Sequence, residues 1–236
     1  MTLYEKAWQA VEVRVIAAAR AAGRDPASVR VLAVSKTVPD GAIRAAYALG
    51  QRAFGENYVQ EAVGKIATLS DLEAVEWHLI GPLQGNKARL AAMNFSWVQS
   101  VDRLQIAERL AGGRGADRPL LNVCIQVNIS GESSKSGCAP ETALGLAQAV
   151  ARQRSLALRG FMGIAEETTD VGRQRAQFRT LRLLFDHARA AGLPVDTLSM
   201  GMSADMEAAI AEGSTGVRIG SALFGARPRR TESTSA

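Results

Sequence analysis

Residues 29–36 read VRVLAVSK and lead through Pro39 into the alanine-rich stretch DGAIRAAYALG at 40–50. The valine-rich run is typical of a buried β-strand, because branched side chains pack well on a pleated sheet. Pro39 lies where a helix is expected to begin, and the residues after it have a helical composition. The stretch therefore predicts a strand that ends at Lys36 and is followed by a helix, which is the repeating unit of an α/β protein.

The same alternation of a short apolar run and a longer Ala- and Leu-rich segment recurs to the end of the chain. Eight apolar runs are present, at 29–36, 52–57, 75–81, 97–101, 121–129, 156–164, 197–201 and 215–225. They predict a closed (β/α)8 TIM barrel of the α/β class, with one extra amphipathic helix within residues 1–20. The alternative fold for such repeats is an open, doubly wound parallel sheet. Further helix starts are expected at Pro140 and after Ser203, which we expect to be an N-cap.

The length of the chain favours one domain. Its 236 residues suit a single barrel, a fold that typically takes about 250 residues. We predict that residues 1–227 form this barrel and that the polar segment 228–236 forms a disordered tail.

Composition excludes several classes of protein. No apolar run is long enough to span a membrane, and the first residues do not resemble a signal peptide. The two cysteines, Cys124 and Cys138, form no metal-binding or disulfide motif, so a cytoplasmic location is expected. The net charge is +5, but basic residues are interspersed with acidic ones, so we expect neither nucleic-acid nor membrane binding.

Three other sequence patterns do not meet the requirements of a phosphate, dinucleotide or metal site. The segment 81–88, GPLQGNKA, is one residue short of a phosphate-binding loop, and 112–117, GGRGAD, lacks the third glycine of a dinucleotide-binding fingerprint. His78 and His187 lie far apart in the sequence, without acidic or cysteine neighbours at ligand spacing. No metal site is predicted.

A lysine and two loops point to one site. Lys36 ends the first predicted strand, and Ser203 and the pair Gly220–Ser221 follow the last two. In a closed barrel these strand ends are neighbours, and the loops after strands 7 and 8 commonly bind phosphate. A ligand with an aldehyde at one end and a phosphate at the other would bridge them. Pyridoxal 5′-phosphate (PLP), held covalently as a Schiff base (an aldimine) on Lys36, is such a ligand.

Arg218 is the third element of this site. It precedes Gly220 by two residues, so strand alternation directs both to the same side. A guanidinium only donates hydrogen bonds, so beside the pyridine nitrogen of PLP it would keep that nitrogen unprotonated. The ring would then be a weak electron sink, which favours cofactor binding over catalysis.

Several longer motifs resemble one family. The segments VLAVSKT, FGENYVQE, EWHLIGPLQGNK, SSKSG, TLSMGMSADMEAAI and VRIGSALFGAR are similar to those of the pyridoxal phosphate homeostasis protein family, also described as the YggS/PROSC family. The resemblance runs from about residue 2 to 227. It implies a fold similar to the alanine racemase barrel (PLP fold type III), PLP on Lys36, and no established catalytic activity.

The resemblance also assigns individual residues. It implies that Ser203, Gly220 and Ser221 bind the phosphate and that Arg218 faces the ring nitrogen. Three further residues would lie beside the ring: Asn57, Tyr58 and Met162. Two departures from the family are Val38, where some relatives carry a second lysine, and the Gly-rich segment 112–119. Lys135, in SSKSG, matches a family lysine that could react with excess PLP, although an exposed amine without that role is the simpler interpretation.

Two functions follow from this site. The first is a monomeric carrier that serves PLP homeostasis and passes PLP to apo-enzymes. The alternative is a PLP-dependent amino-acid racemase or decarboxylase, which needs an acid/base group on each face of the cofactor. Lys36 would serve one face, and Tyr58 is the only tyrosine near a predicted strand end. We therefore expect a carrier rather than an enzyme.

Overall fold

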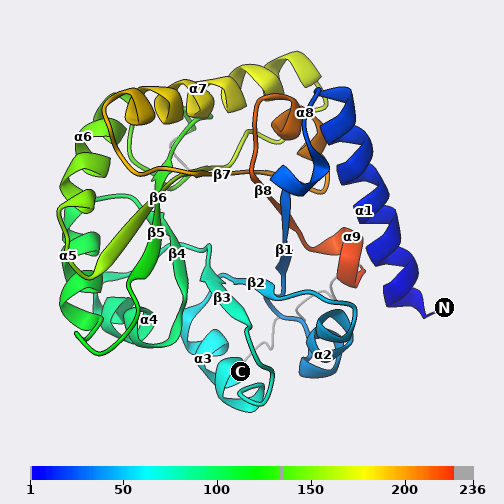
Figure 1. Ribbon diagram of the computed structural model, residues 1–236, viewed down its shortest axis with the longest axis horizontal. Helices are drawn as coiled ribbons and strands as arrows, with labels where there is room; N and C mark the ends of the chain where they lie inside the picture. Colours follow the sequence, from blue (N-terminus) through cyan, green and yellow to red (C-terminus); the bar gives the residue numbers. More distant parts are fainter. Residues whose placement is uncertain (1, 133–134, 226–236) are drawn as a thin grey trace, which may run out of the picture.

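Eight parallel strands close into a barrel in the order in which they occur along the chain (Figure 1). The computed structural model describes residues 2–132 and 135–225. Each strand pairs with its neighbours in sequence, and β8 closes the ring by pairing with β1. The strands are β1 (Arg30–Val34), β2 (Ala53–Glu56), β3 (Glu76–Leu79), β4 (Trp97–Val101), β5 (Leu121–Val127), β6 (Leu156–Gly163), β7 (Thr197–Met202) and β8 (Gly216–Ile219).

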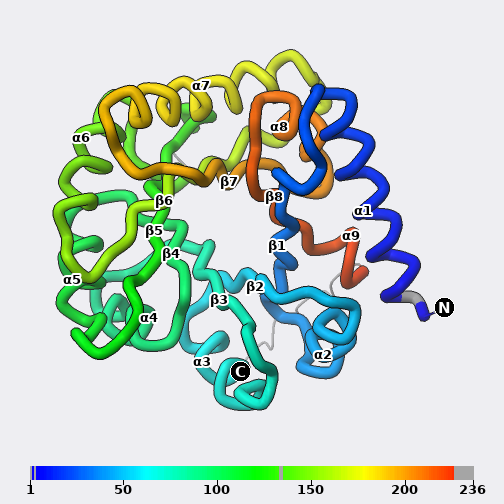
Figure 2. The backbone as a smooth tube through the Cα atoms, in the orientation of Figure 1, coloured from blue at the N-terminus to red at the C-terminus, as the bar shows by residue number. Residues whose placement is uncertain are grey.

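The helices form an outer layer around this ring, and α1 packs beside α8 and α9 in both Figure 1 and Figure 2. The TIM-barrel prediction and the extra N-terminal helix are thus confirmed. The helices are α1 (Leu3–Ala21), α2 (Asp40–Ala48), α3 (Val59–Thr68), α4 (Ala88–Asn94), α5 (Leu104–Gly113), α6 (Pro140–Ala151), α7 (Val171–Ala190), α8 (Met206–Ala211) and α9 (Ser221–Phe224), with short 3-10 turns η1 (Pro26–Ser28) and η2 (Gly85–Lys87).

The apolar run 215–225 contains a strand and a short helix. β8 ends at Ile219, so Gly220 and Ser221 follow the strand as expected, and the chain turns at Gly220 into α9. One helix start differs from the sequence prediction. Ser203 is not the N-cap of α8, which is Asp205. The Asp205 Oδ1 accepts a hydrogen bond from the Met202 amide at 2.5 Å, which closes a turn through Ser203 and delays the helix. Helix starts after Pro39 and at Pro140 are confirmed.

Most of the apolar core lies between the strands and the helices. Its largest fully buried side chains include Phe54, Phe161 and Phe178. Within the barrel several polar side chains are also buried, among them His78 and Gln99. The interior of the barrel therefore contains buried polar side chains as well as packed apolar ones.

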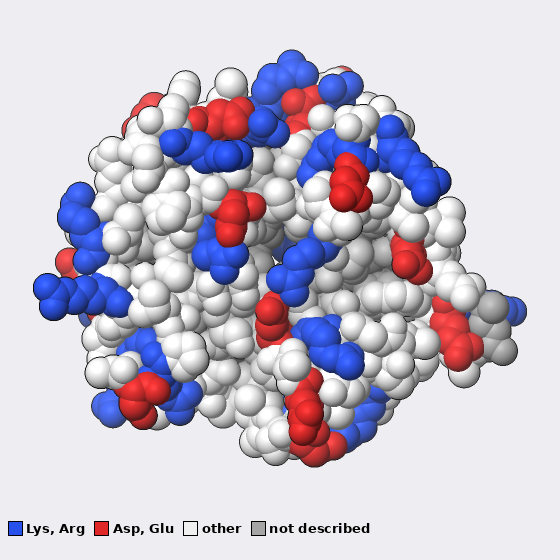
Figure 3. All heavy atoms as spheres, viewed as in Figure 1, with Lys and Arg blue, Asp and Glu red and all other residues white. Residues whose placement is uncertain are grey.

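Charged side chains of both signs are interspersed over the face seen in Figure 3, which is hollowed at its centre. In the described part of the chain, no helix is long and apolar enough to cross a membrane. The tail predicted at 228–236 lies outside the described residues.

Candidate functional site

A cavity of about 290 Å³ opens at the carboxyl ends of the strands. That volume is near the lower end of the range for small-molecule sites, roughly 300–1,000 Å³. Six of the eight residues predicted from sequence line it: Lys36, Asn57, Ser203, Arg218, Gly220 and Ser221. The remainder of the lining was not predicted, and it consists of Val34, Ile80, Ile164, Met202 and Ala204.

Helix α3 holds the backbone on both sides of Lys36. Lys65 Nζ donates to the Ser35 carbonyl at 2.6 Å, and the Thr37 amide donates to Glu61 Oε1 at 2.7 Å. Thr37 has φ 61°, a left-handed conformation that a β-branched residue adopts only when its surroundings impose it. Lys65 and Glu61 also pair with each other at 2.8 Å. The two α3 side chains thus form a clamp that fixes the segment carrying Lys36.

Glu56, at the end of β2, anchors the clamp from inside the barrel wall. Its side chain is fully buried, and Oε1 accepts hydrogen bonds from Ser35 Oγ at 2.6 Å and Lys65 Nζ at 3.0 Å. Burial raises the pKa of the Glu56 carboxyl, while Ser35 and Lys65 oppose the rise. Within the described chain, Oε2 has no hydrogen-bond partner. The carboxylate therefore depends strongly on Lys65.

Replacing Lys65 with methionine is expected to destabilise the fold by about 2 kcal/mol, because Glu56 would lose a charged donor in a buried position. Urea unfolding at pH 7 measures the change. The double variant Lys65→Met, Glu56→Gln should recover part of the loss, since no buried carboxyl is left. Lys6→Met, on the exposed side of α1, is the matched control. Equal stability of the Lys65 and Lys6 variants would contradict this account.

Arg218 lies on β8 beneath the cavity and is buried. Its Nη1 donates to the carbonyl and the hydroxyl of Ser199 at 2.6 and 2.9 Å, and Nη2 donates to the Gly163 carbonyl at 2.8 Å. Burial lowers the pKa of Arg218 to about 10, with nearby Asp205 opposing the change. The guanidinium thus stays protonated at neutral pH. A guanidinium has five N–H donors, so donors beyond these three bonds remain for a ligand.

The loops after β7 and β8 form the part of the cavity wall next to Lys36. Gly201 has φ +94°, and a Cβ there would collide with Ala209, so the chain turns sharply before Ser203. The Ser203 carbonyl accepts a hydrogen bond from Arg14 Nη2 at 3.0 Å, which ties this loop to α1. Gly220 and Ser221 begin α9, and the first amides of a helix lack intrahelical acceptors. Hydroxyls and amides from both loops therefore border the same cavity.

Asn57 lines the cavity, and the chain after β3 passes close to its backbone. A Cβ at Gly81 would collide with the Asn57 backbone, so the chain after β3 can pass close by only with glycine at that position. Neither Tyr58 nor Met162 lines the cavity. Tyr58 is 58% exposed, and Met162 is buried against Trp97 and Cys124. Their ring-side roles stay predictions.

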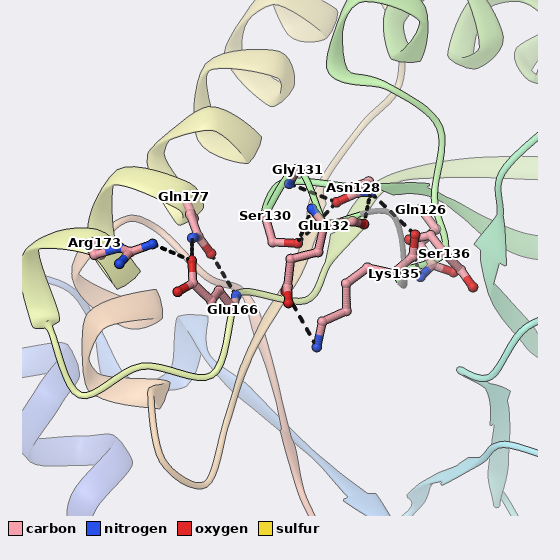
Figure 4. A network of polar contacts seen from close by, with 10 residues as sticks. All are labelled: Gln126, Asn128, Ser130, Gly131, Glu132, Lys135, Ser136, Glu166, Arg173 and Gln177. Carbon is pink, nitrogen blue, oxygen red and sulfur yellow. Dashed lines mark hydrogen bonds and ion pairs between the residues drawn. The ribbon is translucent and has the colours of Figure 1, made fainter.

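Lys135 belongs to the loop after β5, outside the cavity lining (Figure 4). Asn128 organises this loop by donating to the Glu132 carbonyl at 2.9 Å and accepting from the Gly131 amide at 3.1 Å. The Lys135 Nζ lies 3.9 Å from a Glu132 carboxylate oxygen, with its side chain about one-third exposed. The amine is partly accessible and weakly paired.

The clamp residues Glu61 and Lys65, and Glu56 that anchors them, were not identified from sequence. One signal was available, because Lys65 is one of only five lysines in the chain. Its spacing of four residues from Glu61 indicates an ordinary surface ion pair, and nothing in that spacing connects it with Lys36.

The chain is similar in sequence to one family model and to several named proteins. A family model described as "Alanine racemase, N-terminal domain" matches residues 9–228. A Pseudomonas aeruginosa protein named "Pyridoxal phosphate homeostasis protein" is 59% identical over 218 residues, which cover 92% of this chain and 93% of that protein. The protein of the same name from Escherichia coli K12 is 51% identical over 219 residues, covering 92% of this chain and 94% of that protein.

Solved structures agree with these sequence matches. PipY of Synechococcus elongatus, solved with PLP bound, is 39% identical with a TM-score of 0.78, and the match covers 91% of this chain and all of that one. An alanine racemase from Clostridium difficile has a TM-score of 0.68 at 15% identity, covering 86% of this chain and 54% of that one, which shows a shared fold alone. On the sequence matches and the barrel geometry together, the chain belongs to the pyridoxal phosphate homeostasis protein family.

Proposed function

We propose that this protein holds PLP as a Schiff base on Lys36 and serves intracellular PLP homeostasis as a carrier. The observation that carries the proposal is one cavity lined by Lys36, by the Ser203 and Gly220–Ser221 loops, and by Arg218. The PLP-bound structure of PipY supports the same ligand. Close relatives named as homeostasis proteins support the carrier role.

Each end of PLP matches a different group of residues. The aldehyde carbon would join Lys36 Nζ in a C=N bond, with water as the leaving group. The phosphate would accept hydrogen bonds from Ser203, Ser221 and backbone amides at the start of α9. The lysine and the phosphate loops come from β1, β7 and β8, which are consecutive in the ring.

Arg218 would set the character of the ring. It offers only donors and stays protonated at neutral pH, so a pyridine nitrogen facing it accepts a hydrogen bond and stays unprotonated. PLP in that state is a weak electron sink, which suits storage and transfer of the cofactor. This is the physical reason to favour a carrier over the alternative racemase or decarboxylase.

The enzyme alternative also lacks a second acid/base group at the site. Within the described chain, the cavity lining contains neither a tyrosine nor a histidine. We expect no sustained turnover when the PLP-loaded protein is incubated with the common L-amino acids and the products are resolved by chiral chromatography. An alanine racemase assayed in parallel is the positive control. Repeated turnovers per protein molecule would overturn the carrier assignment.

A carrier needs proteins that receive its PLP. We propose a cytoplasmic monomer that transfers PLP to apo-PLP enzymes. Mixing the PLP-loaded protein with an apo-PLP enzyme should restore that enzyme's activity. Trapping free PLP with an added amine distinguishes direct transfer from release into solution.

A further inference from the structure

Four buried polar side chains form a continuous hydrogen-bonded chain across the barrel interior. Arg218 on β8 donates to Ser199 Oγ on β7 at 2.9 Å, and Ser199 Oγ donates to Gln99 Oε1 on β4 at 2.6 Å. Gln99 Nε2 lies 2.9 Å from His78 Nδ1 on β3. All four residues are at least nine-tenths buried. The chain thus links Arg218, beneath the candidate PLP cavity, to the opposite side of the barrel.

The chemistry of Arg218 fixes the direction of every bond in this chain. A guanidinium can only donate, so Ser199 Oγ accepts from it and directs its own proton to Gln99 Oε1. Gln99 must then present its NH₂ group to His78, and Nδ1 must accept. His78 is therefore neutral with its proton on Nε2, which agrees with burial lowering the pKa of His78.

His78 is the last residue of this row of hydrogen bonds, and it lies at a second cavity. This cavity, of about 410 Å³, is lined by His78, Gln99 and Ser199 together with Arg30 and Arg159. The His78 ring stacks on the Trp97 ring, with 5.0 Å between the ring centroids. Its Nε2 makes no hydrogen bond in the described chain, and the Glu76 carboxylate, paired with Arg30, lies 3.5 Å away. His78 is thus held by its ring stack, by the hydrogen bond to Gln99 and by the longer contact with the Glu76 carboxylate.

We propose that Gln99 and His78 are positioning residues, which act through Ser199 to fix the Arg218 guanidinium against the PLP ring nitrogen. This inference rests on the proposed function, since it takes PLP as the ligand above Arg218. Without the Gln99 acceptor the Ser199 hydroxyl can rotate, and Arg218 keeps only the Ser199 and Gly163 carbonyls as fixed acceptors. The ring nitrogen then meets a less fixed donor and takes up a proton more easily.

A matched pair at His78 separates positioning from packing. In His78→Asn, the side-chain oxygen can replace Nδ1 as the acceptor for Gln99, whereas His78→Leu has no acceptor. Both variants lose the ring stack on Trp97, so both should lose similar stability in urea unfolding. Gln99→Leu removes the hydrogen bonds that Gln99 makes to both Ser199 and His78. Wild type and each variant are loaded with PLP, and the visible band is titrated against pH.

We expect His78→Leu and Gln99→Leu to raise the apparent pKa of the PLP ring nitrogen, read from the pH dependence of the visible band, by about 0.5–1 unit. This shift is equivalent to about 0.7–1.4 kcal/mol. His78→Asn should restore the wild-type titration despite its lower stability. Equal titrations of the Asn and Leu variants would show that His78 acts through packing alone and would overturn the proposal.

Two further measurements keep this inference separate from the proposed function. Nitrogen-15 NMR of the histidines in the PLP-free protein should show the Nε2–H tautomer at His78, and the Nδ1–H tautomer would contradict the direction of the chain. Arg218→Gln should shift the visible titration more than any other variant. If Arg218→Gln has no effect, the placement of Arg218 beside the ring fails. If it shifts the titration and Gln99→Leu does not, only the positioning proposal fails.

Discussion

Lys36→Ala is expected to abolish the visible Schiff-base absorbance of the PLP-loaded protein while leaving the barrel folded. Lys36 follows the end of β1 at the barrel mouth and is only partly buried, so its side chain contributes little to the core. No other lysine lines the cavity in the described chain. The visible spectrum measures the loss, and far-ultraviolet circular dichroism checks the fold.

Lys87→Ala and Lys135→Ala are the matched controls for this variant. Both lysines lie outside the cavity lining, in η2 and in the loop after β5. Their loss should leave the absorbance at the wild-type level. Absorbance retained by Lys36→Ala but lost in either control would place the cofactor elsewhere.

Ser203→Ala and Ser221→Ala are each expected to weaken PLP retention by roughly ten- to a hundredfold. A hydroxyl that donates to a dianionic phosphate contributes about 1.5–3 kcal/mol, and each 1.4 kcal/mol corresponds to about tenfold in affinity. Backbone amides at the start of α9 remain in both variants, so neither should abolish binding. Equilibrium dialysis of the PLP-loaded proteins measures the retention.

Pyridoxal, which lacks the phosphate, is the control ligand for these two variants. It can still react with Lys36 but has no group for the serine loops. It should bind the wild-type protein far more weakly than PLP and be almost insensitive to either substitution. Equal retention of pyridoxal and PLP by the wild-type protein would show that the loops do not bind phosphate.

The arrangement of the strands could be predicted because each β/α repeat leaves a local pattern. Each of the eight apolar runs overlaps a strand, and closure of the ring brings β1, β7 and β8 together as expected. The apolar run 215–225 extends past β8, because SALF at 221–224 is apolar enough for either a strand or a short helix. The N-cap was misplaced because Asp205 competes with Ser203 through a turn that only tertiary structure fixes.

Residues that lie at strand ends were easier to predict than those that act across the barrel. Lys36, Ser203 and Ser221 lie within two residues of a strand end, and the topology alone places them together. The clamp and the interior chain depend on side chains from distant elements. The hydrogen bond between Ser199 and Gln99, for example, joins residues one hundred positions apart. No local pattern indicates such a contact.

The proposed function depends first on a covalent bond between PLP and Lys36. The most direct measurement is borohydride reduction of the PLP-incubated wild-type protein, followed by proteolysis and peptide mass mapping. We predict one pyridoxyl phosphate group per chain, on the peptide that contains Lys36. An unmodified Lys36 peptide, with the label on Lys135 or another lysine, would contradict it.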